Sequence, residues 1–249
     1  MPVIEGPVLV LGATSGIARE IALGLAEKGA SLFLAGRDLD ELERMSGDLR
    51  IRTGVRIETG LFDADEPSAH LAFYQDASAV MGGFVGAVLA IGYLGDQSRA
   101  QSDWQEAHAI LLRNFVAAAS VLHVIAAAFE KNESGWIVAL SSVAGDRGRM
   151  SNYVYGSAKG GLAVFLQGLR SRLQKSDVHV LTVKPGPVDT AMTFGMSKLP
   201  LLAQPNVVGR AIVKALEKGK DVVYVPGPWR AIMFVLRSVP EAVFKKTRL

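Results

Sequence analysis

The stretch Val8–Glu20, "VLVLGATSGIARE", joins a short apolar run to a helical pattern through a glycine-rich turn. A continuous apolar run of this kind is typical of a parallel strand that is covered on both faces. Gly12 and Gly16 lack a Cβ, so the backbone of the turn can approach another group closely. A helix that begins here offers free N–H groups to a phosphate, and Thr14 and Ser15 add hydroxyl donors. The stretch therefore predicts dinucleotide binding, with a plain tight turn as the structural alternative.

The alternation of apolar runs and helical patterns continues along the whole chain. Strand-like runs lie at residues 7–11, 31–35, 55–60, 86–90, 135–140, 178–183 and 221–225, and helical patterns lie near 16–29, 38–50, 65–79, 101–131, 152–175 and 205–218. Several runs are continuous rather than alternating, as expected for parallel strands. We therefore predict one α/β domain over residues 1–249, with a doubly wound, mostly parallel seven-stranded sheet and helices on both faces.

Composition excludes several classes of protein. Of 249 residues, 49% are hydrophobic, which gives a large core and excludes a disordered or fibrous chain. The net charge of +3 comes with no basic run, so we expect no nucleic-acid partner. There is no cysteine, and the four histidines are not at metal-ligand spacing, so we expect no metal. The N-terminus lacks signal-peptide features and no apolar stretch is long enough to span a bilayer, so we expect a cytoplasmic protein.

The residues after the second and third strands bear on the type of cofactor. An acidic residue after the second strand would hold the ribose 2′-hydroxyl of NAD, but this chain has Gly36 and then Arg37. A guanidinium can pair with a 2′-phosphate, so we predict NADP(H) over NAD(H). The alternative is that Arg37 is a solvated loop charge and Asp38 caps the next helix. Asp63 is expected to accept a hydrogen bond from the adenine amino group, or only to cap a helix that begins near Asp65.

The segment 151–160, "SNYVYGSAKG", carries two tyrosines ahead of a lysine. Tyr155 and Lys159 are four residues apart and share one face of a helix, whereas Tyr153 has Ser157 at that offset. Free tyrosine has a pKa of about 10, too high for an efficient acid or base near neutrality. An ammonium one turn away would lower the pKa of the phenol by about 1–3 pH units. A bound, positively charged nicotinamide ring would act in the same direction.

Further motifs complete a pattern that resembles a known family. The run "GWIVALSS" ends at Ser142, 13 residues before Tyr155, and residues 185–190 read "PGPVDT". Together with the glycine-rich turn and the Tyr155–Lys159 pair, they make the chain similar to the short-chain dehydrogenase/reductase family from about residue 7 to residue 225. The resemblance implies a Rossmann fold, hydride transfer between a nicotinamide and a carbonyl or alcohol substrate, and a homodimer or homotetramer assembled through the helices near 101–131 and 152–175.

The resemblance also implies roles for single residues. Tyr155 would be the general acid/base, Lys159 would lower its pKa and hold the nicotinamide ribose, and Ser142 would hydrogen-bond the substrate carbonyl. Asn114 matches the asparagine that holds a water for proton relay; alternatively it is a mid-helix polar residue facing solvent. The expected cofactor contacts are Gly12, Thr14, Ser15, Gly16, Ile17, Arg37, Asp63, Ala90, Gly92, Tyr155, Lys159, Pro185, Gly186, Val188 and Thr190.

Two positions depart from the family pattern. Leu11 stands where the family usually has threonine, and "LAIG" at 89–92 replaces a motif that often contains two asparagines. We expect the backbone contacts of Ala90 and Gly92 with the cofactor to remain. The side-chain bridges that stiffen this crossover are in question, whereas the catalytic positions are unaffected.

Two segments near the C-terminus leave alternatives open. Residues 190–204 fit neither period and are either a lid or binding loop, or a packed connection. The tail 228–249 is apolar nearly all round, with one helical stripe of Trp229, Ile232, Met233 and Leu236. Its basic residues are Arg230, Arg237, Lys245, Lys246 and Arg248. The tail is either a helix packed on the core or on another subunit, or an interfacial membrane element attracted to anionic lipid.

A narrower likeness concerns substrate. The segments 90–96 and 144–161 and the basic tail are similar to reductases of a keto-pentose carried on decaprenyl phosphate, a polyprenyl phosphate, at the membrane surface. On that hypothesis, Arg147 and Arg149 would face a phosphate at the mouth of the site, and otherwise they are solvated loop charges. A non-catalytic NADP-binding module is a further alternative, but such a module would need only the glycine-rich turn.

Overall fold

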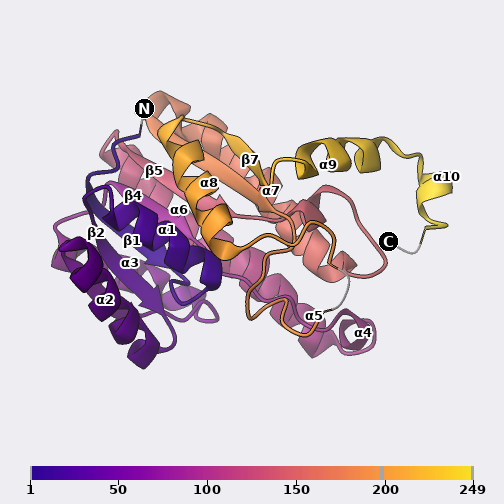
Figure 1. The fold of residues 1–249 in the computed structure, drawn as a ribbon, viewed down its shortest axis with the longest axis horizontal. Helices are drawn as coiled ribbons and strands as arrows, with labels where there is room; N and C mark the ends of the chain where they lie inside the picture. Colours follow the sequence, from indigo (N-terminus) through magenta and orange to yellow (C-terminus); the bar gives the residue numbers. More distant parts are fainter. Residues whose placement is uncertain (1, 197–198, 248–249) are drawn as a thin grey trace.

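The sheet has seven strands, and every pairing between them in the described residues is parallel (Figure 1). The computed structural model describes residues 2–196 and 199–247. The strand order is β3-β2-β1-β4-β5-β6-β7. Successive strands are therefore added on one side of β1 up to β3 and on its other side from β4 onward, so the strand order reverses between β1 and β4. The strands are β1 (Gly6–Leu11), β2 (Ala30–Gly36), β3 (Ile57–Leu61), β4 (Gly86–Leu89), β5 (Gly135–Leu140), β6 (Val178–Pro185) and β7 (Val222–Val225). This confirms the predicted α/β fold, in which ligands bind at such a reversal, beyond the carboxyl ends of the strands.

Helices cover both faces of the sheet. The longer ones are α1 (Gly16–Ala26), α2 (Leu39–Thr53), α3 (His70–Met81), α5 (Trp104–Leu111), α6 (Ala117–Lys131), α7 (Tyr153–Leu173), α8 (Pro205–Glu217) and α9 (Trp229–Ser238). The short ones are α4 (Gln97–Ala100), α10 (Glu241–Phe244), the 3₁₀ turns η1 (Pro67–Ala69), η3 (Val143–Asp146) and η4 (Gln174–Ser176), and the π-helical turn η2 (Leu112–Val116). Apolar side chains of α1, α2 and α8 pack on one face, and those of α3, α6 and α7 pack on the other. The central strands β1, β2, β4, β5 and β6 are therefore largely buried on both faces, as the continuous apolar runs predicted, whereas the edge strands β3 and β7 are partly exposed.

The helix predicted over 101–131 begins later and is interrupted. Asp103 caps α5 by accepting a hydrogen bond from the Gln105 N–H at 2.9 Å, so the helix starts at Trp104. The turn η2 then separates α5 from α6. By length and composition alone, this 28-residue stretch could cross a membrane, contrary to the prediction that no apolar stretch is long enough. However, its Val121 and Phe129 are fully buried in the core, which accounts for its apolar character.

The tail leaves the body of the molecule as two helices, α9 and α10, at one end of Figure 1. Trp229 and Met233 are buried against Val143, whereas Phe234 and Val235 are 73% and 61% exposed. The buried stripe agrees with the interpretation of a helix packed on the core, whereas contact of the exposed face with another subunit or with a membrane stays a prediction. One stripe packs on the core, and residues 248–249, including the predicted basic Arg248, lie outside the described residues.

Candidate active site

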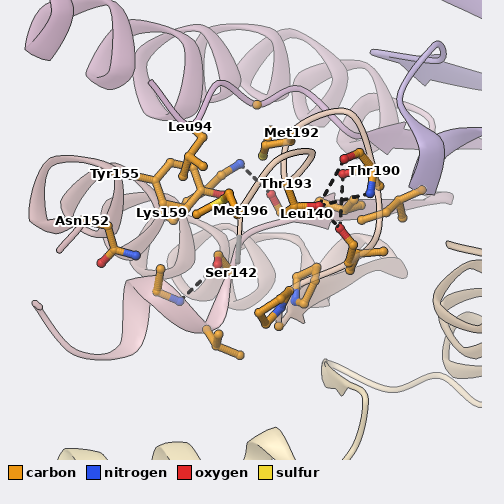
Figure 2. A pocket seen from close by; sticks show the side chains of 18 of the residues that line it. Leu94, Leu140, Ser142, Asn152, Tyr155, Lys159, Thr190, Met192, Thr193 and Met196 are labelled. Carbon is orange, nitrogen blue, oxygen red and sulfur yellow. Dashed lines mark hydrogen bonds between the residues drawn. The ribbon is translucent and has the colours of Figure 1, made fainter. Parts of the chain in front are cut away.

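A cavity of about 750 Å³ opens at the carboxyl ends of the strands. Its wall is built from the glycine-rich turn, the ends of β4, β5 and β6, the start of α7 and the segment after β6 (Figure 2). Most of the predicted site residues line it, namely Thr14, Ser15, Gly16, Ile17, Ala90, Gly92, Ser142, Tyr155, Lys159, Pro185, Gly186, Val188 and Thr190. Gly12, Arg37, Asp63 and Asn114 do not.

The glycine-rich turn forms one end of the cavity. The Ser15 hydroxyl oxygen caps α1 by accepting a hydrogen bond from the Ala18 N–H at 3.2 Å, so its O–H is free to donate. A Cβ on Gly16 would lie 3.1 Å from Thr190 Cγ2, so the absence of a side chain lets residue 190 close the wall here. Gly12 lies behind the wall, with φ +74°, and a Cβ there would lie 2.9 Å from the Ala90 carbonyl oxygen. Glycine is therefore required at residue 12 by the positive φ of the turn and by the close backbone of Ala90 after β4, and not by contact with the cavity.

Lys159 joins the ends of two strands. Its side chain is buried, and Nζ donates hydrogen bonds to the carbonyl oxygens of Ile91 at 3.2 Å and Leu140 at 3.0 Å. An ammonium has three N–H donors, so one remains for a ligand in the cavity. These bonds stiffen the crossover after β4, where the asparagines of the family pattern are missing. Burial lowers the pKa of Lys159 to about 8.

Tyr155 and Ser142 face each other in the cavity. The Ser142 hydroxyl oxygen accepts a hydrogen bond from the Ala144 N–H at 3.1 Å and caps η3. Burial raises the pKa of Tyr155 to about 12, and a side-chain hydrogen bond with Ser142 acts in the opposite direction. Lys159 Nζ lies 5.9 Å from the centre of the Tyr155 ring. The predicted lowering of the Tyr155 pKa is therefore wrong for the polypeptide alone, because desolvation of the phenolate outweighs the hydrogen bond with Ser142.

Close backbone packing sets the position of Ser142 relative to Tyr155. A Cβ on Gly156 would lie 2.8 Å from the Ala144 carbonyl oxygen, and a Cβ on Gly145 would lie 2.6 Å from the Gly160 nitrogen. Side chains at these positions would therefore push η3 away from α7. The sequence pattern did not predict that Gly145 and Gly156 matter for the site.

A buried acid holds η3 from the other side. Asp146 forms an ion pair with Lys184 of β6, and both side chains are at most 10% exposed. The Tyr224 hydroxyl of β7 donates to Asp146 Oδ2 at 2.7 Å. Burial, followed by this hydrogen bond, raises the pKa of Tyr224 to about 12. Two strands thus fix the turn that follows Ser142.

Asn114 is fully buried, so the solvent-facing alternative is wrong. It lies in η2, where Nδ2 donates to the carbonyl oxygens of Tyr93 at 2.6 Å and Ile110 at 2.8 Å, and Oδ1 accepts from the Tyr93 N–H at 3.1 Å. A Cβ on Gly92 would lie 3.5 Å from Asn114 Oδ1 and 3.6 Å from Lys159 Nζ. Asn114 thus anchors the backbone beside the cavity without lining it, and its part in proton relay stays a prediction.

Arg37 and Asp63 are exposed and lie outside the cavity wall. Asp38 caps α2 by accepting from the Glu41 N–H at 3.0 Å, as the structural alternative expected. Asp63 accepts from the Asp65 N–H at 3.0 Å, but no helix begins there, since the first turn of helix starts at Pro67. The roles of Arg37 and Asp63 in cofactor binding stay predictions.

The two arginines of the loop before α7 have different environments. Arg147 donates to Glu241 at 2.7 Å and lies over the Phe244 ring at 4.3 Å, so it holds the tail. Arg149, in contrast, lines the cavity. The prediction that both arginines face the mouth of the site is therefore wrong for Arg147.

Several lining residues were not predicted. The segment after β6 places Met192, Met196 and Leu199 on the cavity, which favours the binding-loop interpretation of residues 190–204, of which 197–198 lie outside the described residues. Trp229 of α9 also reaches it, and a Cβ on Gly186 would lie 2.0 Å from the indole Nε1. The apolar stripe of the tail indicated a buried face, but no local signal showed which surface it covers.

Comparison with known proteins places this geometry in context. The family model described as short chain dehydrogenase matches residues 7–198. The chain is 41% identical to an uncharacterized oxidoreductase of Mycobacterium tuberculosis strain H37Rv, over 96% of each chain. Its fold is similar to a short-chain dehydrogenase from Sphingobium yanoikuyae in complex with NADPH, with a TM-score of 0.82, 22% identity and coverage of 95% and 97% of the two chains. It is also similar to an NAD⁺-bound xylitol dehydrogenase, with a TM-score of 0.80, 19% identity and coverage of 89% and 98%.

Proposed function

The chain belongs to the short-chain dehydrogenase family of oxidoreductases, and we propose that it transfers a hydride between NADP(H) and a carbonyl or secondary alcohol, with Tyr155 as the acid/base. The observation that carries the proposal is the convergence of Ser142, Tyr155 and Lys159 on one cavity that also contains the glycine-rich turn. A module that only bound a dinucleotide would not require Ser142, Tyr155 and Lys159 together at one cavity.

The residues of the cavity fit a nicotinamide dinucleotide. Its volume of about 750 Å³ lies within the range of about 300–1,000 Å³ that is usual for ligand sites. The wall is lined by Gly16, Gly92 and Gly186, where side chains would take up space. Donors with capacity left for a ligand include the third N–H of Lys159 and the indole N–H of Trp229, which has no hydrogen-bond partner among the described residues. Together these groups would hold phosphate, ribose and carboxamide.

The mechanism follows from the groups at the other end of the cavity. When bound, NADPH supplies the hydride that adds to the carbonyl carbon. Tyr155 would donate its proton to the carbonyl oxygen, and the Ser142 O–H would hydrogen-bond the same oxygen as its negative charge develops. The buried ammonium of Lys159 would stabilise the resulting phenolate. In the oxidative direction the same groups act in reverse, with Tyr155 accepting the proton of the alcohol.

The preference for NADP(H) rests on Arg37. It directly follows β2, is exposed, and has no acidic residue before it in that turn. Asp38 is the first carboxylate, and it is engaged as the cap of α2. A free guanidinium beside the adenosine ribose would favour a 2′-phosphate.

Two matched variants test the proposal. We expect Tyr155→Phe to bind NADPH with unchanged affinity in a fluorescence titration, while kcat for ketone reduction falls about 10²–10⁴-fold. Tyr153→Phe is the control, since Tyr153 is 43% exposed on the outer face of α7 and should keep full activity. In the same titration, Arg37→Ala should weaken NADPH at least tenfold and leave NADH unchanged.

Equal activity of the two tyrosine variants would overturn the role of Tyr155. NADPH binding without turnover of any ketone would instead favour the non-catalytic module. The cytoplasmic location and the homodimer or homotetramer stay predictions. Light scattering measures the assembly, for which the exposed Val164 of α7 is a candidate contact.

A further inference from the structure

Four buried polar atoms on the cavity wall have no hydrogen-bond partner among the described residues. They are Gln97 Nε2, Arg149 Nε, Asn152 Oδ1 and Trp229 Nε1. A buried polar group without a partner costs about 1–3 kcal/mol, so such groups are rare in folded proteins. Trp229 lies against Gly186 and belongs to the cofactor end described above. The cofactor contacts and the proton transfer proposed above use none of the remaining three groups.

These three groups come from neighbouring elements. Gln97 Oε1 accepts a hydrogen bond from the Val154 N–H at 3.1 Å, which joins α4 to the first turn of α7. The bond orients the amide of Gln97, so its Nε2 is left as a donor. Asn152 immediately precedes α7 but makes no capping hydrogen bond with its side chain. Arg149 precedes Asn152 by three residues in the same loop, so the three groups line the wall where α4 meets the start of α7.

Arg149 gives this part of the wall a positive charge. Asp96, next to Gln97, also lines the cavity, and its Oδ1 caps α4 by accepting from the N–H groups of Ser98 and Arg99. The Arg149 side chain forms no hydrogen bond or ion pair within the described part of the chain, and burial lowers the pKa of its guanidinium. Arg147, two residues earlier, is neutralised by Glu241. A partly buried guanidinium without a carboxylate is costly unless a ligand supplies the negative charge.

We propose that Gln97, Arg149 and Asn152 form a substrate subsite that binds an anionic oxygen group, a carboxylate or a phosphate, on the carbonyl substrate. Arg149 and Gln97 donate to the anion, and Asn152 Oδ1 accepts from a hydroxyl of the same molecule. This inference rests on the proposed function and names its substrate class. The phosphates of the cofactor are not the anion in question, because the glycine-rich turn begins α1, which lies well apart from α4 (Figure 1).

Pairs of small ketones that differ only in charge test the proposal. The probes are 4-oxopentanoate with its methyl ester, and dihydroxyacetone phosphate with dihydroxyacetone; inorganic phosphate tests the anion alone. Binding is measured by thermal shift and calorimetry with NADP⁺ saturating, so that the phosphate sites of the cofactor are filled and the ketone is not reduced; turnover is followed separately with NADPH. The proteins are wild type, Arg149→Gln and Arg147→Gln, the last as a matched control from the same loop.

We expect wild type to bind at least one charged ketone at least tenfold more tightly than its uncharged partner. Arg149→Gln should reduce this preference to within twofold without weakening the uncharged ketone, and Arg147→Gln should retain it. Charge-independent binding by wild type, or an unchanged preference in Arg149→Gln, would overturn the subsite. Which pair responds distinguishes carboxylate from phosphate. Failure of the proposed function is a separate result, since the enzyme would then bind the charged ketone but consume no NADPH with it.

Discussion

At the scale of single residues, burial decides the properties of the catalytic pair. The spacing of Tyr155 and Lys159 predicted that they lie close together, and both line the cavity. Spacing gave no information on desolvation, which raises the pKa of the phenol and lowers that of the ammonium. Similarly, nothing local distinguished Arg147 from Arg149, because the partner of Arg147 is Glu241, which is far away in the sequence.

The buried ammonium of Lys159 should make stability depend on pH. Its folded pKa of about 8 lies below the ordinary value of 10.5. Between these pH values the unfolded chain holds a proton that the folded chain has released, so the free energy of unfolding rises with pH. From pH 8 to pH 10 we expect a gain on the order of 2 kcal/mol from this group. Above pH 10 Tyr155 acts in the opposite direction, because its folded pKa of about 12 exceeds its ordinary value of 10.

Urea denaturation at pH 7, 8, 9 and 10 measures this dependence. Lys159→Met has no group to titrate at this position, so its stability should lack the gain seen in wild type. Comparing the two proteins cancels the contribution of the exposed lysines. Parallel curves for wild type and variant would contradict the prediction.

At the scale of elements, the contact of η3 with α7 shows what a sequence pattern can and cannot predict. Short apolar runs between helical patterns predicted all seven strands, since several of the runs are continuous, the local pattern of strands buried on both faces. The interruption of the long helix was not predicted, because η2 contains Asn114, whose side chain bonds the backbone of Tyr93 in another segment. The need for glycine in α7 was not predicted either, because it comes from the backbone of η3 that packs against the helix.

Two glycines of α7 provide a matched test of this contact. A Cβ on Gly156 would collide with the Ala144 carbonyl oxygen, whereas a Cβ on Gly168 would meet nothing within 4 Å. Gly156→Ala should displace η3 and with it Ser142, and reduce kcat about 10²-fold, as expected for misplacement by about 1 Å. Gly168→Ala should keep full activity and stabilise the helix by about 0.5–1 kcal/mol. Steady-state kinetics and thermal unfolding measure both effects, and an active Gly156→Ala would contradict the prediction.

At the scale of the whole molecule, the C-terminal tail takes part in the cavity. Arg147 of the loop before α7 binds Glu241 of α10, and Trp229 of α9 lies against Gly186 after β6. The sequence predicted the apolar stripe of the tail and a cofactor contact at Gly186. The contact between Trp229 and Gly186 was not predicted, because it depends on the complete fold. One face of the tail therefore belongs to the core, and its other face is exposed. Residues 228–249 had been interpreted either as a packed helix or as a membrane element, not as a helix with two different faces.

Substitutions on opposite faces of α9 test separately whether the tail supports the cavity and whether it contacts a membrane. Trp229 is 5% exposed and Phe234 is 73% exposed, so the two aromatic residues lie on the buried and the exposed face of this helix. We expect Trp229→Ala to weaken NADPH about tenfold or more, because it removes both a wall of the cavity and an N–H donor. Phe234→Ser should leave NADPH affinity unchanged, since its side chain contacts solvent. Equal losses in the two variants would contradict a specific role for Trp229. Flotation with anionic vesicles, repeated with Phe234→Ser, tests membrane contact separately, because an interfacial helix would lose binding with this exposed apolar residue.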